Sequence, residues 1–226
     1  MVLFLREYMK YILFDLDGTL MDFNKGEANA FIDTMMHFKA YIPKKEEISH
    51  FSFLNEKLFN QFAKGEMTRI EFQEKRFKEI MEYLGMDGDI SLFNKYYVES
   101  LKYQADLFDG VVDVLEELSK KYRLFIASNG MNQVQIKRLK KAGIYDYFEK
   151  IYISECIGYN KPDKEFFEYI IKDIEDDNRK EYIMIGDRYD TDIMGAKKVG
   201  IDGILLSKEK KDCITISSIK DILNIL

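Results

Sequence analysis

Short apolar runs recur along this 226-residue chain, and segments with helical periodicity separate them. The runs lie at residues 11–14, 124–127, 151–153, 182–185 and 203–206, with a candidate edge strand at 214–216. Apolar residues three and four positions apart predict helices at residues 111–121, 133–142, 164–172 and 191–199. Continuous apolar strands that alternate with helices are typical of parallel sheets covered on both faces. We therefore predict an α/β fold with a Rossmann-like parallel sheet, whose functional groups gather at the carboxyl ends of the strands.

Residues 23–103 interrupt this alternation. They contain no convincing strand, and their apolar residues recur at helical spacing. Thr68-Arg69-Ile70-Glu71 has the form of a capping box and predicts a helix that continues through Met81. We expect a core domain formed by residues 1–22 and 106–226, and an inserted all-α helical-bundle domain at residues 23–105.

The charge balance narrows the choice of partner. With 34 basic and 40 acidic residues the net charge is −6, which argues against nucleic-acid binding because that needs a basic surface. One basic run, Lys137, Arg138, Lys140 and Lys141, could contact phosphate, but its helical spacing favours a solvated helix face.

We also expect a cytoplasmic protein without a membrane partner. The apolar stretch at residues 1–5 is short and charged residues follow it, unlike a signal peptide. No segment approaches the roughly 20 apolar residues of a membrane span. Cys156 and Cys213 are far apart and form no C-x-x-C pair, which favours a reducing compartment.

The first apolar run leads directly into Asp15-Leu16-Asp17-Gly18-Thr19. On extended backbone, alternate side chains share a face, so the carboxylates of Asp15 and Asp17 can serve one site. A surface acidic turn is the simpler alternative. The apolar strand that precedes Asp15 argues against it, because such a strand places the turn at the functional edge of a sheet.

Groups suited to an anion follow the second and third runs. Ser128-Asn129-Gly130 offers a hydroxyl and backbone N–H groups before a predicted helix, although this sequence is also common in ordinary turns. Lys161 stands before Pro162 and the start of another helix. It could be an ordinary solvated lysine of a loop or, because it follows the third strand, a functional residue.

Two more carboxylates, Asp187 and Asp192, follow the fourth run in a turn that begins with Gly186. They could cap the next helix, or they could supply the oxygen ligands that Mg²⁺ prefers. Each of the four clusters is ambiguous alone. Their order, each after its own strand, points to one shared site.

In this order the clusters resemble the haloacid dehalogenase-like hydrolases. Their pattern is D-x-D-x-[TV], then Ser or Thr, then Lys, then G-D-x-x-x-D or G-D-x-x-x-x-D. The resemblance extends from about Lys10 to the C-terminus, and the helical insertion is similar to a type-one cap domain. It implies a Mg²⁺-dependent phosphatase acting on a small-molecule phosphate ester, as a monomer or homodimer.

The resemblance also implies a role for each residue. Asp15 would be the nucleophile and Asp17 the general acid and base. Phosphate would be bound by Ser128, Asn129 and Lys161. The metal ligands would be Asp15, the backbone carbonyl of Asp17, and Asp187. Asp192 would act through water or by orienting Lys161.

Other chemistries remain open at this point. A dehalogenase would lack Asp17, whereas a phosphomutase would use the same residues; a non-catalytic binding protein on the same fold is a further alternative. His37 and His50 match no motif, and we expect packing or surface positions for them.

The stretch from Ser128 to Lys164 resembles the bacterial pyrimidine 5′-nucleotidases, and related acyl-sugar phosphatases share much of it. Its shared elements are Ser128-Asn129-Gly130 with a following Gln, Arg138-Leu139, Gly143-Ile144, Ser154-Glu155 and Lys161-Pro162-Asp163-Lys164. We therefore expect nucleoside monophosphates as substrates, with sugar or acyl-sugar phosphates as the alternative. Aromatic residues of the insertion could stack on a base; most of them should be core.

Overall fold

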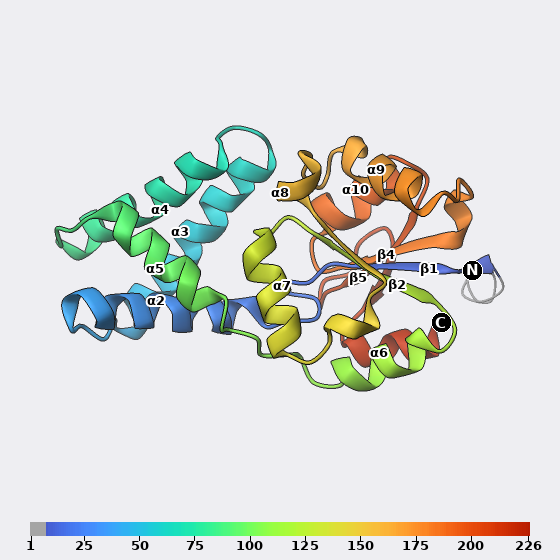
Figure 1. Ribbon diagram of the computed structural model, residues 1–226, viewed down its shortest axis with the longest axis horizontal. Helices are drawn as coiled ribbons and strands as arrows, with labels where there is room; N and C mark the ends of the chain where they lie inside the picture. Colours follow the sequence, from blue (N-terminus) through green and yellow to red (C-terminus); the bar gives the residue numbers. More distant parts are fainter. Residues whose placement is uncertain (1–7) are drawn as a thin grey trace. The chain divides into compact units, whose positions relative to one another are not determined.

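The computed structural model describes residues 8–226, so the apolar stretch at residues 1–5 lies outside the described part. Its larger unit is built on a six-stranded sheet with strand order β3-β2-β1-β4-β5-β6, in which every neighbouring pair is parallel (Figure 1). The strands are β1 (Tyr11–Phe14), β2 (Arg123–Ser128), β3 (Lys150–Ile153), β4 (Tyr182–Gly186), β5 (Asp202–Leu206) and β6 (Ile214–Ile216). Strands β2 and β3 are added on one side of β1, and β4, β5 and β6 on the other. Open α/β sheets bind ligands at a point where the strand order reverses in this way.

Helices cover both faces of this sheet, because alternate residues of each strand face opposite sides. Ile12 and Phe14 pack with α6 (Val111–Ser119), α7 (Asn132–Lys141) and the C-terminal 3₁₀ helix (Ile219–Asn224). Tyr11 and Leu13 pack on the other face with α9 (Lys164–Ile174) and α10 (Met194–Lys197). Figure 1 shows α6 on one side of the sheet and α9 with α10 on the other. A short helix, α8 (Ser154–Ile157), follows β3. The predicted α/β fold is thus confirmed.

One predicted helix differs from the structure. Residues 191–199 do not form a regular α-helix; a π-helical turn spans Tyr189–Ile193, and α10 follows it. In this wider turn Asp192 is buried, and its carboxylate accepts a hydrogen bond from the backbone N–H of Arg188 at 3.0 Å. Wide turns of this kind are frequent at functional sites. Apolar spacing does not reveal one, since it adds only one residue to a helical turn.

Residues 23–105 form a separate compact unit of four helices. They are α2 (Phe23–Lys39), α3 (Lys45–Ala63), α4 (Arg69–Leu84) and α5 (Ile90–Leu101). The predicted capping box is present: Thr68 Oγ1 accepts from the N–H of Glu71 at 3.2 Å, and the Glu71 carboxylate accepts from the N–H of Thr68 at 2.7 Å. The helix continues past Met81 to Leu84, where Gly85 ends it in a left-handed conformation with φ 62°.

The two chain segments that lead into and out of this helical unit are adjacent where they leave the sheet unit. The N–H of Asp22 donates to the carbonyl of Asp106 at 3.0 Å, and the N–H of Phe108 donates to the carbonyl of Leu20 at 3.1 Å. Across residues 8–226, no helix combines the length and the apolar character needed to cross a bilayer.

Candidate active site

Asp15 follows the central strand β1 and is nearly buried. Its N–H donates to the carbonyl of Ile185 at 2.8 Å, which continues the pairing of β1 with β4 and fixes the backbone. One carboxylate oxygen accepts from Lys161 Nζ at 2.7 Å. The other lies 3.3 Å from the hydroxyl of Thr19, which is fully buried. The first carboxylate of the predicted pair therefore has a fixed position at the carboxyl end of the central strand.

Lys161 lies between two carboxylates and is 2% exposed. Its ammonium group is 2.7 Å from Asp15 Oδ1 and 2.7 Å from Asp192 Oδ1. Burial alone would lower the pKa of Lys161, but the charges of Asp15 and Asp192 outweigh it and raise the pKa above its usual value. The side chain is a permanent cation at neutral pH, suited to an anionic ligand.

Asn129 fixes the backbone that carries this lysine. Its side-chain amide donates to the carbonyl of Lys161 at 2.8 Å and accepts from the N–H of Lys161 at 2.8 Å. The loop after β2 is thereby tied to the loop that precedes α9. Ser128, at the end of β2, is buried, and its hydroxyl accepts from the N–H of Gly130 at 3.1 Å.

Asp187 completes a cluster of three carboxylates after β1 and β4. Oxygens of Asp15, Asp187 and Asp192 all lie within 4.8 Å of one another. Asp187 lies against Gly18, which has φ +91°, and a Cβ at that glycine would collide with the carboxylate. Only a residue without a side chain leaves room for Asp187 beside the turn that follows β1.

This cluster fits a divalent cation. Burial raises the pKa of Asp15 well above its usual value, and burial together with the charge of Asp192 raises the pKa of Asp187 to about 6. Burial is the largest cause of both shifts, and the charges of the neighbouring carboxylates add to it while Lys161 opposes it. Hard oxygen donors that need a positive charge are typical Mg²⁺ ligands. Asp192 is already engaged by Lys161 and by the N–H of Arg188.

Asp17 is held by two residues that the sequence did not identify as part of the site. Its carboxylate forms an ion pair with Arg138 and accepts a hydrogen bond from the side-chain amide of Gln135 at 2.6 Å. Gln135 and Arg138 are both 1% exposed, whereas the side chain of Asp17 is 25% exposed. Asp17 is therefore supported from inside the protein and open on its other side.

The prediction of a solvated basic face on this helix is wrong for Arg138. Lys137, Lys140 and Lys141 are exposed, but Arg138 is among the largest fully buried side chains. The helical register contains the signal: Arg138 lies three residues after Gln135 and four after Val134, which are both buried. A positively charged side chain on the buried face of a helix needs a partner of opposite charge, and for Arg138 this partner is Asp17.

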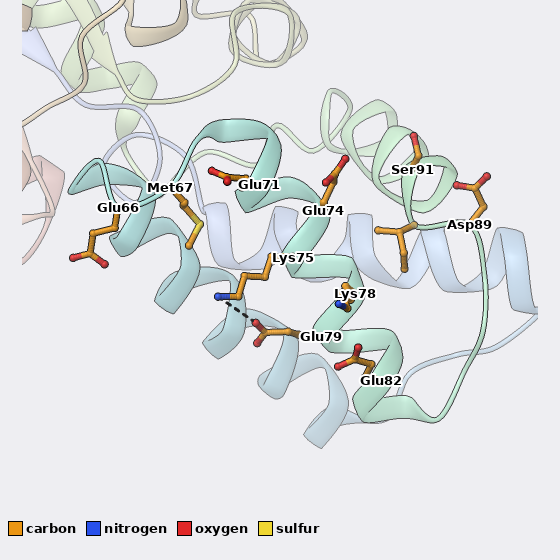
Figure 2. Close-up of a pocket in the computed structure, with 11 residues that line it drawn as sticks. Glu66, Met67, Glu71, Glu74, Lys75, Lys78, Glu79, Glu82, Asp89 and Ser91 are labelled. Atoms are coloured by element: carbon orange, nitrogen blue, oxygen red, sulfur yellow. Dashed lines mark ion pairs between the residues drawn. The ribbon is translucent and has the colours of Figure 1, made fainter.

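The hollow drawn in Figure 2 has a volume of about 840 Å³ and lies within the helical unit. Its lining is mostly acidic and consists of Glu66, Met67, Glu71, Glu74, Lys75, Lys78, Glu79, Glu82, Asp89, Ile90 and Ser91. A phosphate ester would be repelled by these carboxylates. None of the residues of the four sequence clusters lines it, so it is not the candidate active site.

The remaining residues singled out from the sequence are peripheral. His37 stacks on Tyr96 with ring centroids 4.1 Å apart, and His50 stacks on Tyr83 at 3.9 Å. Cys156 and Cys213 are both free thiols.

Comparison with known proteins gives one family. The model of the haloacid dehalogenase-like hydrolases matches residues 12–206. The HAD-hydrolase YfnB of Bacillus subtilis is 31% identical over 201 residues, covering 88% of this chain and 85% of YfnB. The pyrimidine 5′-nucleotidase PynA of Streptococcus pneumoniae is 30% identical, covering 87% of this chain and 83% of PynA. A glyceraldehyde 3-phosphate phosphatase of Methanothermobacter thermautotrophicus is 28% identical, covering 89% of this chain and 87% of that protein.

The crystal structure of YfnB, bound to magnesium, superposes with a TM-score of 0.91 at 28% identity, covering 97% of this chain and 99% of that chain. The resemblance of the sequence to the nucleotidase branch is confirmed by the relatives. By its sequence, its fold and its relatives, this chain belongs to the haloacid dehalogenase-like hydrolases and is a phosphatase.

Proposed function

We propose that the protein is a Mg²⁺-dependent phosphomonoesterase that works through an aspartyl-phosphate on Asp15. The observation that carries this proposal is the buried arrangement of Asp15, Lys161 and Asp192 beside Asp187. A carboxylate with a fixed position, next to a permanent cation, is suited to attack an anionic phosphoryl group.

In the first step, an oxygen of Asp15 forms a bond to phosphorus while the bond from phosphorus to the leaving oxygen breaks. Asp17, in its protonated form, gives its proton to that leaving oxygen. In the second step, Asp17 takes a proton from water, the water oxygen bonds to phosphorus, and the Asp15–phosphorus bond breaks. Inorganic phosphate leaves, and Asp15 and Asp17 return to their starting forms.

The other residues bind the phosphoryl group and the cation. Lys161, Ser128 and the N–H of Asn129 would bind phosphoryl oxygens, and Asp192 would hold Lys161 in place. Mg²⁺ would be bound by Asp15, Asp187 and the backbone carbonyl of Asp17, with support from the magnesium-bound structure of the relative YfnB. When bound, the cation offsets the repulsion between the carboxylate and the phosphate.

For the substrate we propose nucleoside 5′-monophosphates, with pyrimidine nucleotides preferred. The similarity to PynA over 87% of the chain supports this class. The helical unit, as a cap domain, would select the substrate. Seven of its fifteen Phe and Tyr side chains are buried in its core, among them Phe51, Phe62, Phe72, Phe77 and Tyr97. Phe53 is 66% exposed, and we propose that an exposed ring of this unit stacks on the base.

A second substrate class has its own support. The glyceraldehyde 3-phosphate phosphatase covers the chain as fully as PynA does, at 28% identity. The substrate in its name is a small sugar phosphate that lacks a nucleobase. The two substrate classes can therefore be distinguished by whether a nucleobase increases turnover. Acyl-sugar phosphates also lack a nucleobase and can be compared in the same way.

The test is a phosphate-release panel measured with Mg²⁺. It compares pyrimidine and purine 5′-monophosphates with glyceraldehyde 3-phosphate, phosphoglycolate, hexose phosphates and an acyl-sugar phosphate. Stacking on a base contributes about 1–3 kcal/mol, so we expect kcat/KM for pyrimidine nucleotides to exceed that for base-free substrates by roughly 10- to 100-fold. If a sugar or acyl-sugar phosphate is preferred by about tenfold or more, the nucleotidase assignment is wrong and the phosphatase chemistry stands.

The closure of the helical unit during turnover is a further part of the proposal. The YfnB crystal structure reveals interdomain movement in that relative. Here the unit of residues 23–105 is joined to the rest of the chain at two adjacent crossings. Hinges near residues 22–24 and 104–108 would allow it to exclude bulk water while the reaction proceeds.

A further inference from the structure

Helix α7 presents two buried polar side chains on one face. Gln135 and Arg138 are three residues apart, so they lie side by side on the helix. The start of α7 is itself fixed, because the carboxylate of Glu155, in α8, accepts from the N–H of Asn132 at 2.7 Å. An anionic group at a helix N-terminus satisfies a free N–H and is favoured by the helix dipole.

These two side chains form a closed network with Asp17. Arg138 Nη1 donates to Asp17 Oδ1 and, at 3.0 Å, to Gln135 Oε1. Gln135 Nε2 donates to Asp17 Oδ2 at 2.6 Å and to Ser128 Oγ at 3.0 Å. Each oxygen of the Asp17 carboxylate therefore has its own donor. Rotation of the carboxylate would break both bonds at once.

The surroundings leave little freedom in this network. A Cβ at Gly130 would collide with the side chain of Gln135, so this glycine gives the glutamine its space. Each oxygen of a carboxyl group has two lone-pair positions, so a donor on the inner side leaves the outer side able to carry a proton. The Asp17 side chain is 25% exposed, so solvent and substrate can reach it.

We propose that Gln135 and Arg138 are positioning residues that hold Asp17 in line with the leaving oxygen of the substrate. This inference rests on the proposed role of Asp17 as general acid and base. Arg138 also places a positive charge beside the carboxylate that remains once Asp17 has given up its proton. Through Ser128, the same network connects the general acid to the phosphate-binding loop.

A purely structural role for the pair predicts a different outcome. If Arg138 only neutralises Asp17 and holds α7 in place, its loss damages every substrate alike. If it positions the general acid, the loss depends on how much the leaving group needs a proton. A p-nitrophenolate leaves without one, whereas the alkoxide of a nucleotide or sugar phosphate does not.

The experiment measures kcat/KM, which reports the first phosphoryl transfer, for p-nitrophenyl phosphate and for an alkyl phosphate ester. The variants are Arg138→Met, Arg138→Lys and Gln135→Leu, with Lys137→Met as the matched control for loss of an exposed positive charge on the same helix. Asp17→Asn and the double variant Asp17→Asn with Arg138→Met complete the set. Thermal unfolding identifies any variant that fails to fold, and Arg138→Lys then serves as the milder change.

For Arg138→Met we expect kcat/KM to fall by about 10- to 100-fold for the alkyl ester and by less than about threefold for p-nitrophenyl phosphate. Arg138→Lys should recover part of the loss, and Lys137→Met should match wild type. The double variant should be no slower than Asp17→Asn alone, since positioning has no further value once the acid is gone.

Parallel losses for both esters, or additive losses in the double variant, would overturn the positioning role. The experiment distinguishes failure of the proposed role of Asp17 from failure of the positioning role of Gln135 and Arg138. If Asp17→Asn itself shows no selective loss with the alkyl ester, the proposed function of Asp17 is wrong. If Asp17→Asn shows that loss and Arg138→Met does not, only the positioning inference is wrong.

Discussion

In the proposed mechanism single carboxylates carry the chemistry, and the negative charges of three carboxylates lie close together in this site. Asp15, Asp187 and Asp192 share the buried ammonium group of Lys161. An uncompensated buried charge is costly, and the protein responds by favouring protonation of Asp15 and Asp187. A bound cation would remove this cost. We therefore expect the metal ion and protons to compete for these carboxylates.

We expect Mg²⁺ to bind more weakly as the pH falls below about 6, where Asp187 takes up a proton. Because the pKa of Asp187 is raised in the folded state, its protonation stabilises the metal-free protein at low pH. This stabilisation is lost as the pH rises through about 6. Calorimetric titration with Mg²⁺ should show an affinity at least about tenfold lower at pH 5 than at pH 7, with proton release at the lower pH. Asp190→Asn, an exposed neighbour, should behave as wild type. Equal affinity for Mg²⁺ at pH 5 and pH 7 would contradict this prediction.

At the scale of helices and strands, the parallel sheet could be predicted from sequence because buried parallel strands are continuous apolar runs. The Tyr189–Ile193 turn could not, since its extra residue changes the path of the backbone and not the apolar pattern. The positions of Asp15 and Asp187 could be predicted because each directly follows an apolar strand. The partners of Asp17 did not, because Gln135 and Arg138 lie inside a helix whose basic residues are mostly exposed.

The helical unit contains a buried polar network of its own. Glu27, in α2, accepts a hydrogen bond from Asn55 of α3, and Asn55 in turn accepts from Arg76 of α4 at 3.0 Å. Arg76 also donates to Asn94 of α5 at 2.7 Å. All four helices are therefore connected. Burial raises the pKa of Glu27 to about 7 despite the nearby charge of Arg76.

We expect Glu27 to make the stability of this unit depend on pH. Because its folded-state pKa is raised, its contribution is full below about pH 4.5 and is lost as the pH rises through about 7, on the order of 3 kcal/mol in total. Between pH 5 and pH 8, the unfolding temperature should fall further for wild type than for Glu27→Gln. The exposed Glu74→Gln serves as control. If the unfolding temperature falls equally in wild type and Glu27→Gln, Glu27 does not cause the pH dependence.

On the scale of the whole molecule, the chain consists of two compact units with separate cores. The sheet unit contains all seven residues assigned to the site from sequence. The helical unit contains a packed aromatic core, including Phe31 and Phe51 with ring centroids 4.1 Å apart. Two adjacent crossings connect the units, and a connection of this kind allows hinge movement.

We expect the two units to change their relative arrangement when a phosphate mimic binds. Small-angle scattering should differ between the free protein and the protein with Mg²⁺ and fluoroberyllate, a mimic of the phosphoryl group on Asp15. The Asp15→Asn variant with the same additions is the control and should scatter like the free protein. Superimposable profiles for wild type, with binding shown independently by calorimetry, would contradict hinge closure.

The central claim is that Asp15 carries the phosphoryl group during turnover, and a rapid acid quench tests it most directly. Protein mixed with substrate and Mg²⁺ is quenched within one turnover, digested and analysed by mass spectrometry. We predict that the peptide containing Asp15 gains the mass of one phosphoryl group, and that Asp190→Asn retains this labelling. Asp15→Asn should show neither labelling nor turnover. Turnover without any labelled Asp15 peptide, or hydrolysis by Asp15→Asn at a rate near wild type, would contradict the mechanism.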